Sequence, residues 1–151
     1  ISAIPSTPST SYLGQVHIPF QITANKITIQ TSAVTTPGKI KIALFAEDGQ
    51  SKIFELTTDT LQTSQLITLN LGSSVTINGG YYYIAWMPLG TAEVSLVTYY
   101  STVITPYYLH PTGLNILVGQ MGVPPNTMPA TFDPKTITYQ DQRCLFFRLD
   151  N

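Results

Sequence analysis

Histidine and cysteine, the side chains most often used as metal ligands or nucleophiles, are rare in this chain. It has two histidines, His17 and His110, which are far apart in the sequence and lack acidic neighbours. Metal sites and catalytic triads need such side chains in clusters, and no G-x-S-x-G nucleophile motif occurs. We therefore interpret both histidines as surface or packing residues, and we expect no metal and no other cofactor.

The acidic residues also form no recognisable catalytic pattern. Most of the eight fall in predicted turns: Glu47, Asp48, Asp59, Asp133 and Asp141. A carboxylate pair for sugar hydrolysis would have to come from this set, which we interpret as solvated turn residues. A calcium ion shared by Asp133 and Asp141 is the less favoured alternative. The sequence therefore predicts a protein that is not an enzyme.

Aromatic side chains are the best candidates for a ligand-binding surface, because Tyr and Trp supply stiff, amphipathic contact area for sugars and proteins. We predict ligand binding by a group of five residues: Tyr99, Tyr100, Tyr107, Tyr108 and His110. Pro106 and Pro111 bracket the last three and would keep their loop preorganised. The alternative is that Tyr107 and Tyr108 pack under the loop or into a seam between subunits.

Short strands separated by turn signals must position these residues. Polar and apolar residues alternate at 26–31 and 39–46, as in half-buried strands. Asp48-Gly49 and Asn78-Gly79 are hairpin signals, because Gly adopts positive φ without steric cost. Residues 81–87, YYYIAWM, hardly alternate, which indicates a strand covered on both faces. The pattern predicts an all-β fold, a jelly-roll-like antiparallel β-sandwich with minimal helix.

The core of this sandwich should consist mainly of the inward-facing residues of the predicted strands. We expect burial of Ile27, Ile29, Ile40, Ile42, Leu44, Leu69, Ile84, Val94, Leu96, Leu145 and Phe147. Cys144 is the only cysteine, and its apolar neighbours predict a small buried hydrophobic residue.

The predicted domain organisation has two parts. Residues 1–11 are rich in Pro, Ser and Thr and are typical of an N-terminal linker or arm. Residues 12–151 form the β-sandwich domain. Within it, residues 103–134 hold six of the eleven prolines and predict a long Pro-rich loop, which in a compact domain usually has a function.

Composition limits the partners of the chain. The net charge is −1, and the seven Lys and Arg residues are scattered, so no basic stripe is available for nucleic acid. The apolar runs are too short for membrane insertion. Only 10% of residues are charged, which leaves apolar surface for a closed homo-oligomer to cover. We expect residues 1–11 and part of residues 103–134 to lie against another chain.

Two stretches of the chain resemble a known family. They are KITIQTSAVTTPGKIKIALFAEDGQSKIFELTTDT and ITLNLGSSVTINGGYYYIAWMPL. The Pro37-Gly38 loop, the strand 40–45, the Asp48-Gly49 hairpin and the strand 80–85 are similar to those of a β-sandwich domain of bacteriophage tail fibres and related virion appendages. The similarity covers residues 12–149, and the long Pro-rich insertion departs from the pattern.

The resemblance implies a non-enzymatic virion protein, the receptor-binding or distal domain of a phage tail fibre. It further implies a homotrimer on the virion surface that contacts other virion proteins and a host surface receptor, which in such domains is often a glycan. Two alternatives stay open. One is a capsid decoration or head-fibre protein with the same sandwich, and the other is a carbohydrate-binding module.

Overall fold

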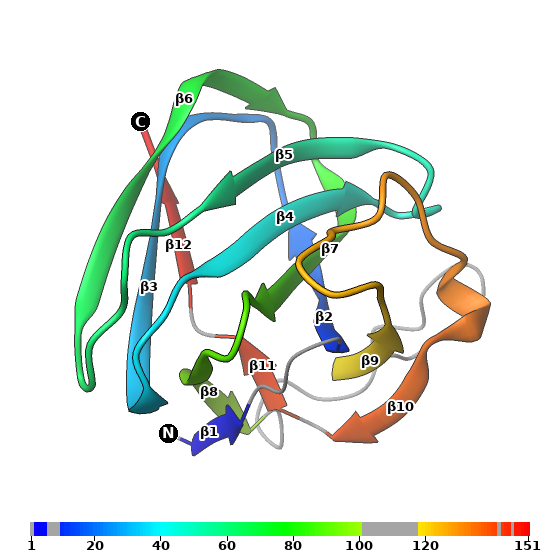
Figure 1. Cartoon of the computed structure of the whole chain (residues 1–151). Helices are drawn as coiled ribbons and strands as arrows, with labels where there is room; N and C mark the ends of the chain where they lie inside the picture. The colour runs from blue at the N-terminus through cyan, green and yellow to red at the C-terminus, as the bar shows by residue number, and fades with distance from the viewer. Residues whose placement is uncertain (1, 6–9, 101–117, 142, 146) are drawn as a thin grey trace.

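The computed structural model describes residues 2–5, 10–100, 118–141, 143–145 and 147–151. These residues form two antiparallel β-sheets that pack against each other, with the strands labelled in Figure 1. Apart from a short 3-10 turn, Pro134–Thr136, the described residues contain no helix. The predicted all-β sandwich with minimal helix is confirmed.

The first sheet has six strands and is built around the 15-residue strand β3. The strands are β1 (Ser2–Pro5), β3 (Ile22–Thr36), β6 (Leu66–Ile77), β8 (Glu93–Tyr100), β11 (Arg143–Leu145) and β12 (Phe147–Asp150). One edge of β3 pairs with β6 and the other with β12, while its second half pairs with β8. β3 therefore continues at both ends beyond the strand predicted at 26–31.

The second sheet also has six strands, in the order β10-β9-β2-β7-β4-β5. Their bounds are β2 (Thr10–Ile18), β4 (Ile40–Ala46), β5 (Lys52–Thr57), β7 (Gly80–Pro88), β9 (Val118–Gly122) and β10 (Thr138–Asp141). β7 lies between β2 and β4, in the middle of the sheet. The predicted hairpin at Asp48-Gly49 joins β4 to β5, with Gly49 at φ 71°.

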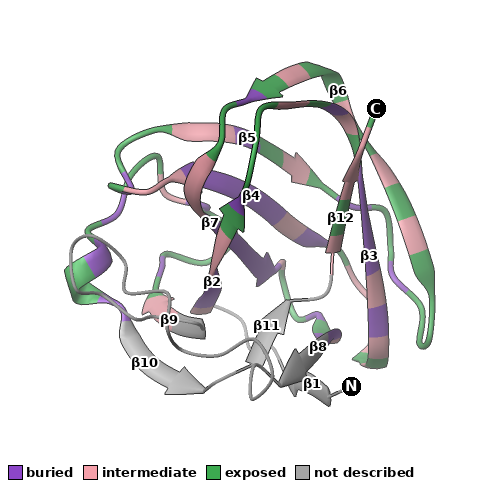
Figure 2. Cartoon of the chain, turned by 180° about the vertical axis from the view of Figure 1, so that it is seen from behind, coloured by how far each residue is buried: buried purple, intermediate pink, exposed green. Residues whose placement is uncertain are grey.

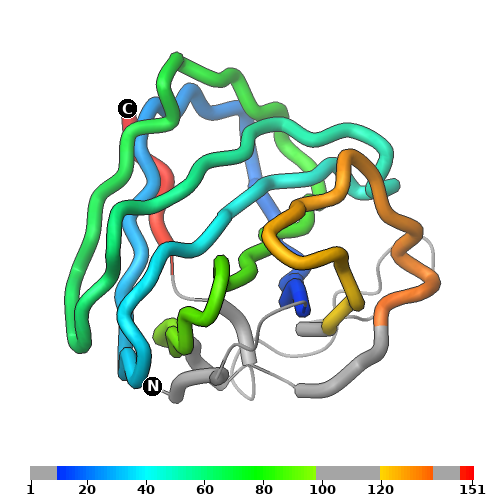
Figure 3. The backbone as a smooth tube through the Cα atoms, viewed as in Figure 1, coloured from blue at the N-terminus to red at the C-terminus, as the bar shows by residue number. Residues whose placement is uncertain are grey.

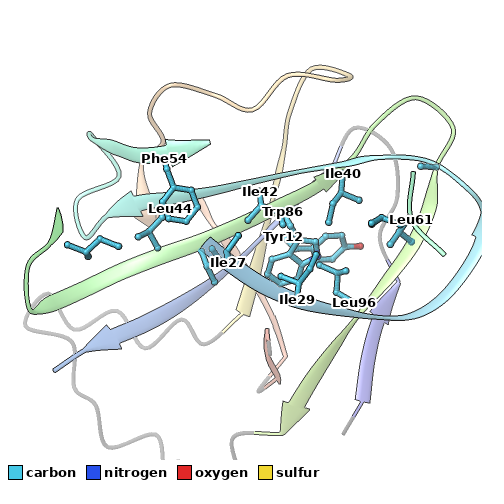
Figure 4. Packing of buried hydrophobic residues seen from close by; sticks show 14 of the residues in the cluster. Tyr12, Ile27, Ile29, Ile40, Ile42, Leu44, Phe54, Leu61, Trp86 and Leu96 are labelled. Carbon is cyan, nitrogen blue, oxygen red and sulfur yellow. The ribbon is translucent and has the colours of Figure 1, made fainter. Parts of the chain in front are cut away.

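The main core lies between the two sheets, as the close view in Figure 4 shows. Eight residues of the predicted core are fully or almost fully buried: Ile27, Ile29, Ile40, Ile42, Leu44, Ile84, Val94 and Leu96. Leu69 and Phe147 are half-buried, because β6 and β12 each pair with β3 alone among the described strands. The side chains of Cys144 and Leu145 lie outside the described residues.

A second apolar layer covers the opposite face of the second sheet. Val123, Met128, Phe132 and Ile137 pack there on residues of β2, β4 and β7. In Figure 2, β7 is buried along most of its length. The side chains that face away from the first sheet, among them Tyr83, are therefore as buried as those that face it. The prediction that residues 81–87 form a strand covered on both faces is confirmed.

Two segments differ from their predicted secondary structure. Residues 2–5, within the predicted arm, pair as β1 with β8 of the same chain. Residues 118–122, within the predicted Pro-rich loop, form β9 and pair with β2 and β10. In both cases the partner strand is distant in the sequence, so no local pattern indicates the pairing. Residues 103–117 of that loop lie outside the described part of the chain.

Candidate functional site

A pocket of about 460 Å³ opens beside the β4–β5 hairpin. Two segments line it: residues 46–51 of the hairpin, and residues 133–135, which are the cap and the first two residues of the 3-10 turn. The lining residues are Ala46, Glu47, Asp48, Ser51, Asp133, Pro134 and Lys135. The tube in Figure 3 follows both segments, and the orange stretch of the second lies next to the hairpin. A volume of this size is typical of a small-molecule site.

The hairpin wall owes its shape to the sequence Asp48-Gly49. The backbone N–H of Gly49 donates to the carbonyl of Ala46 at 2.9 Å, which closes the turn. The N–H of Gln50 donates to Oδ1 of Asp48 at 2.9 Å. Asp side chains commonly accept a hydrogen bond from the backbone two residues on. The Asp48 carboxylate is therefore held in place by its own turn.

The 3-10 turn repeats this arrangement on the other wall. Oδ1 of Asp133 accepts from the backbone N–H of Lys135 at 2.9 Å, and the Thr136 hydroxyl donates to the Asp133 carbonyl at 2.7 Å. Pro134 follows the capping residue, where its fixed φ suits the start of a turn. A second carboxylate is thus positioned by local backbone geometry at the pocket.

Three hydrogen bonds tie the two walls together. The Phe132 N–H donates to the Gly49 carbonyl at 3.0 Å, and Nε2 of Gln50 donates to the Phe132 carbonyl at 3.2 Å. Lys52 Nζ donates to the Pro129 carbonyl at 3.3 Å. A Cβ atom on Gly49 would collide with the Phe132 carbonyl oxygen, so the close approach of the segments needs glycine. The pocket is therefore preformed.

Lys52 also joins an ion-pair network beside the pocket. Its Nζ lies 2.6 Å from one carboxylate oxygen of Glu55, while Nζ of Lys41 lies 3.5 Å from the other. Burial alone would raise the pKa of Glu55, but its hydrogen bond to Lys52 and the charges of Lys52 and Lys41 outweigh burial and lower it. The network keeps Lys52 directed at the segment that carries Phe132.

Tyr83 lies on the same face of the sheet as the pocket. It pairs with Phe45 of β4, and its ring and the Phe132 ring form a T-shaped contact with their centroids 5.3 Å apart. Tyr83 is 0% exposed, and its hydroxyl has no hydrogen-bond partner among the described residues. Burial, together with the negative charge of Glu47, raises the pKa of Tyr83 to about 12. A buried, unpaired hydroxyl is uncommon in proteins and needs an explanation.

The predicted ligand-binding residues are only partly described. The backbones of Tyr99 and Tyr100 belong to β8, opposite Cys144 and Arg143 of β11. Their side chains, and all of Tyr107, Tyr108 and His110, lie outside the described residues. Ligand binding by these five residues therefore stays a prediction.

His17 and Asp133, two residues with predicted surface or turn roles, have defined neighbours. The His17 ring lies 4.8 Å from the Tyr81 ring, on adjacent strands. Asp133 caps the 3-10 turn, while the side chain of Asp141 is outside the described part. Within the described part of the chain, no three His, Cys, Asp or Glu side chains are grouped to hold a metal.

The pocket itself is not predictable from the sequence. Asp48 and Asp133 are each recognisable as turn residues, but their proximity depends on the docking of residues 123–137 onto the hairpin. The only sequence signals are the Asp-Gly pair and the Asp-Pro pair. Each of them predicts a turn and not a binding site.

Comparisons with known proteins identify no relative. No family model matches the chain, and no curated protein is significantly similar in sequence. Among the described residues, no helix is both long and apolar enough to cross a membrane.

Proposed function

We propose that this chain is a non-enzymatic binding domain of a virion appendage, the receptor-binding or distal domain of a phage tail fibre. Support comes from the family resemblance in residues 12–149 and from the all-β sandwich, which is the fold that the resemblance implies. Sandwich folds host many unrelated functions, so the function of this domain depends on its sites. The preformed pocket at the β4–β5 hairpin is the observation that carries the proposal.

The chemistry of the pocket favours binding over catalysis. Enzymes tune acid and base groups towards the pH at which they work. Tyr83 and Glu55 lie beside the pocket and do not line it, and the raised pKa of Tyr83 and the lowered pKa of Glu55 move both groups away from neutral pH. In Asp48 and in Asp133, one carboxylate oxygen accepts a backbone hydrogen bond within its own turn. Such fixed polar groups on a rigid wall are suited to orienting a ligand.

Immunogold electron microscopy of virions tests the location. Antibodies raised against this chain should label the tips of tail fibres, because a distal domain is accessible there. Label spread over the capsid would instead favour the decoration or head-fibre alternative. Intact virions that carry no label would contradict the proposal.

Adsorption assays test the binding function and the predicted aromatic site together. Purified wild-type protein should compete with virions for host cells. The Tyr108→Ala/His110→Ala variant should lose this competition while keeping its fold and assembly. Phe20→Ala is the matched control, since Phe20 is 67% exposed and lies in the β2–β3 connection. Unchanged competition by the double variant would place the receptor site elsewhere, and failure of the wild-type protein to compete would contradict the binding function.

A further inference from the structure

Six of the described strands are edge strands, because each pairs with only one other described strand. Proteins usually protect such edges by keeping them short or by placing charged residues or proline in them. β1, β5, β10, β11 and β12 follow this rule. None of them exceeds six residues, and each contains a proline or a charged residue, such as Pro5, Lys52 and Arg148. β6 has 12 residues and contains neither.

Residues 66–70 form the regular part of β6. They pair with residues 26–30 of β3 without a shift in register, and the regular pairing ends after Asn70, shortly before Gly72 with its φ of 86°. Half-buried and exposed side chains alternate along this part, which Figure 2 shows as pink and green bands. The half-buried ones are Ile67 and Leu69, which pack on the main core, and the exposed ones are Leu66, Thr68 and Asn70.

The outer edge of this segment has no strand beside it among the described residues. β6 runs along one side of the molecule (Figure 1), and Leu66 at its start is 66% exposed. The backbone N–H and C=O groups that point away from β3 have no ladder partner in the described part of the chain. An added strand would pair with these groups and cover the exposed part of Ile67 and Leu69.

The sequence of this segment is complementary to itself. When two copies pair antiparallel with Thr68 opposite its counterpart, Ile67 lies opposite Leu69 and Leu66 lies opposite Asn70. Residues that lie directly opposite each other share one face of a sheet. The Ile67–Leu69 pairs therefore extend the core side of the sheet, and the threonine pair extends its exposed side. A slip of one residue would place apolar residues opposite exposed ones.

Two further observations favour a second copy of the chain as the added strand. A two-fold axis brings residues near it close to their own counterparts, so any charge there would meet a like charge, and β6 contains none. The Thr68 and Thr28 hydroxyls are hydrogen-bonded at 2.9 Å across β6 and β3. Pairs of threonines on neighbouring strands stabilise a sheet, and self-pairing would double the length of this row.

We propose that residues 66–70 of β6 pair antiparallel with the same residues of a second copy, with Thr68 at the two-fold axis. The first sheets of the two copies then form one continuous sheet. This contact produces a dimer, so the trimer that the family resemblance implies would need another surface. The inference does not depend on the function proposed above.

Disulfide cross-linking of single-cysteine additions tests the proposal. Wild type sets the background, because Cys144 is its only cysteine. Thr68→Cys should link to its own copy, since directly opposite Cβ atoms lie about 4.5–5.5 Å apart, close to disulfide range. Leu66→Cys and Asn70→Cys should not self-link, because each is about 13 Å along the strand from its counterpart. A mixture of these two variants should link position 66 to position 70, as mass spectrometry of the linked peptides would show.

Thr57→Cys is the matched control, because Thr57 is exposed on β5, an edge strand that carries charge. Linking at position 68 no faster than at position 57, or self-linking at position 66 or 70, would overturn the proposal.

Hydrogen exchange of the wild-type chain provides a test without substitutions. Amides within residues 66–70 should exchange more slowly in concentrated than in dilute solution, whereas those of β5 should not change. Concentration-independent exchange at residues 66–70, together with a monomer in sedimentation at micromolar concentration, would also contradict the proposal.

Discussion

At the scale of single residues, the contact between the two walls of the pocket requires glycine at position 49, because there is no room for a side chain there. Gly49 has a φ of 71°, and its carbonyl accepts from the Phe132 N–H. A side chain there meets both a left-handed backbone and the Phe132 carbonyl oxygen. Either the hairpin changes conformation or residues 123–137 move away from it.

We expect Gly49→Ala to lower the free energy of unfolding by about 2–4 kcal/mol. The matched control is Gly90→Ala, because Gly90 has φ 60° and open space around its Cβ position. That variant should lose only about 1 kcal/mol, the backbone cost alone. Urea unfolding of both variants measures the difference. Equal losses would mean that the contact with Phe132 contributes nothing.

Tyr83 offers a second test at this scale, because its hydroxyl is buried without a partner. At pH 7, Tyr83→Phe should leave stability unchanged or raise it by about 1 kcal/mol. The raised pKa of about 12 means that the folded state keeps the proton when the unfolded chain, near pH 10, releases it. Stability from this group is complete below pH 10 and is lost as the pH rises from 10 to 12.

Tyr83→Phe has no hydroxyl at this position and so lacks this loss of stability. The difference in unfolding free energy between the variant and the wild type therefore reports Tyr83 alone, because the other tyrosines and the lysines titrate in both proteins. At pH 11 the stability of Tyr83→Phe relative to the wild type should exceed its value at pH 7 by about 1.4 kcal/mol. Urea unfolding at the two pH values measures it. A relative stability that does not change with pH would show that the hydroxyl titrates normally.

At the scale of elements, β6 is an unusually unprotected edge strand. It pairs only with β3 among the described strands, runs for 12 residues and contains no charged residue and no proline. β5, the end strand of the other sheet, carries Lys52 and Glu55. Proteins usually protect open edges with charge, proline or bulges. β6 has one irregularity in register, opposite Ala24 and Lys26, and its first residue, Leu66, is 66% exposed.

The proposed homo-oligomer should use this edge. Leu66→Lys places a charge at an exposed site and should weaken association at least about tenfold. Thr57→Lys is the control, because Thr57 is exposed on the already charged strand β5. Sedimentation equilibrium of the wild type and both variants checks the expectation. Equal association constants would place the subunit contact elsewhere, and a wild-type monomer at micromolar concentration would contradict the oligomer.

At the scale of the whole molecule, local sequence patterns predict much of the sandwich and little of its assembly from distant parts. Alternation at 26–31 and 39–46, the Asp48-Gly49 turn and the continuous apolar strand 81–87 correspond to β3, β4, the β4–β5 hairpin and β7. β1 and β9 were not predicted, because their pairing partners are distant and their own sequences carry weak patterns. The apolar residues on both faces of 81–87 predict that another segment covers the outer face of this strand. They do not indicate that this segment is residues 123–137.

The strand order of the second sheet has a kinetic consequence. In the order β10-β9-β2-β7-β4-β5, only two neighbouring pairs, β4–β5 and β9–β10, are also consecutive in the chain. β2 is synthesised before both of its partners, β7 and β9, which are distant from it in the sequence. Contacts so distant in sequence close large loops before they return any stabilisation, which makes folding slow. This sheet should therefore form completely only after β9 and β10 have been synthesised. Until then its apolar strands are exposed and can associate with other chains.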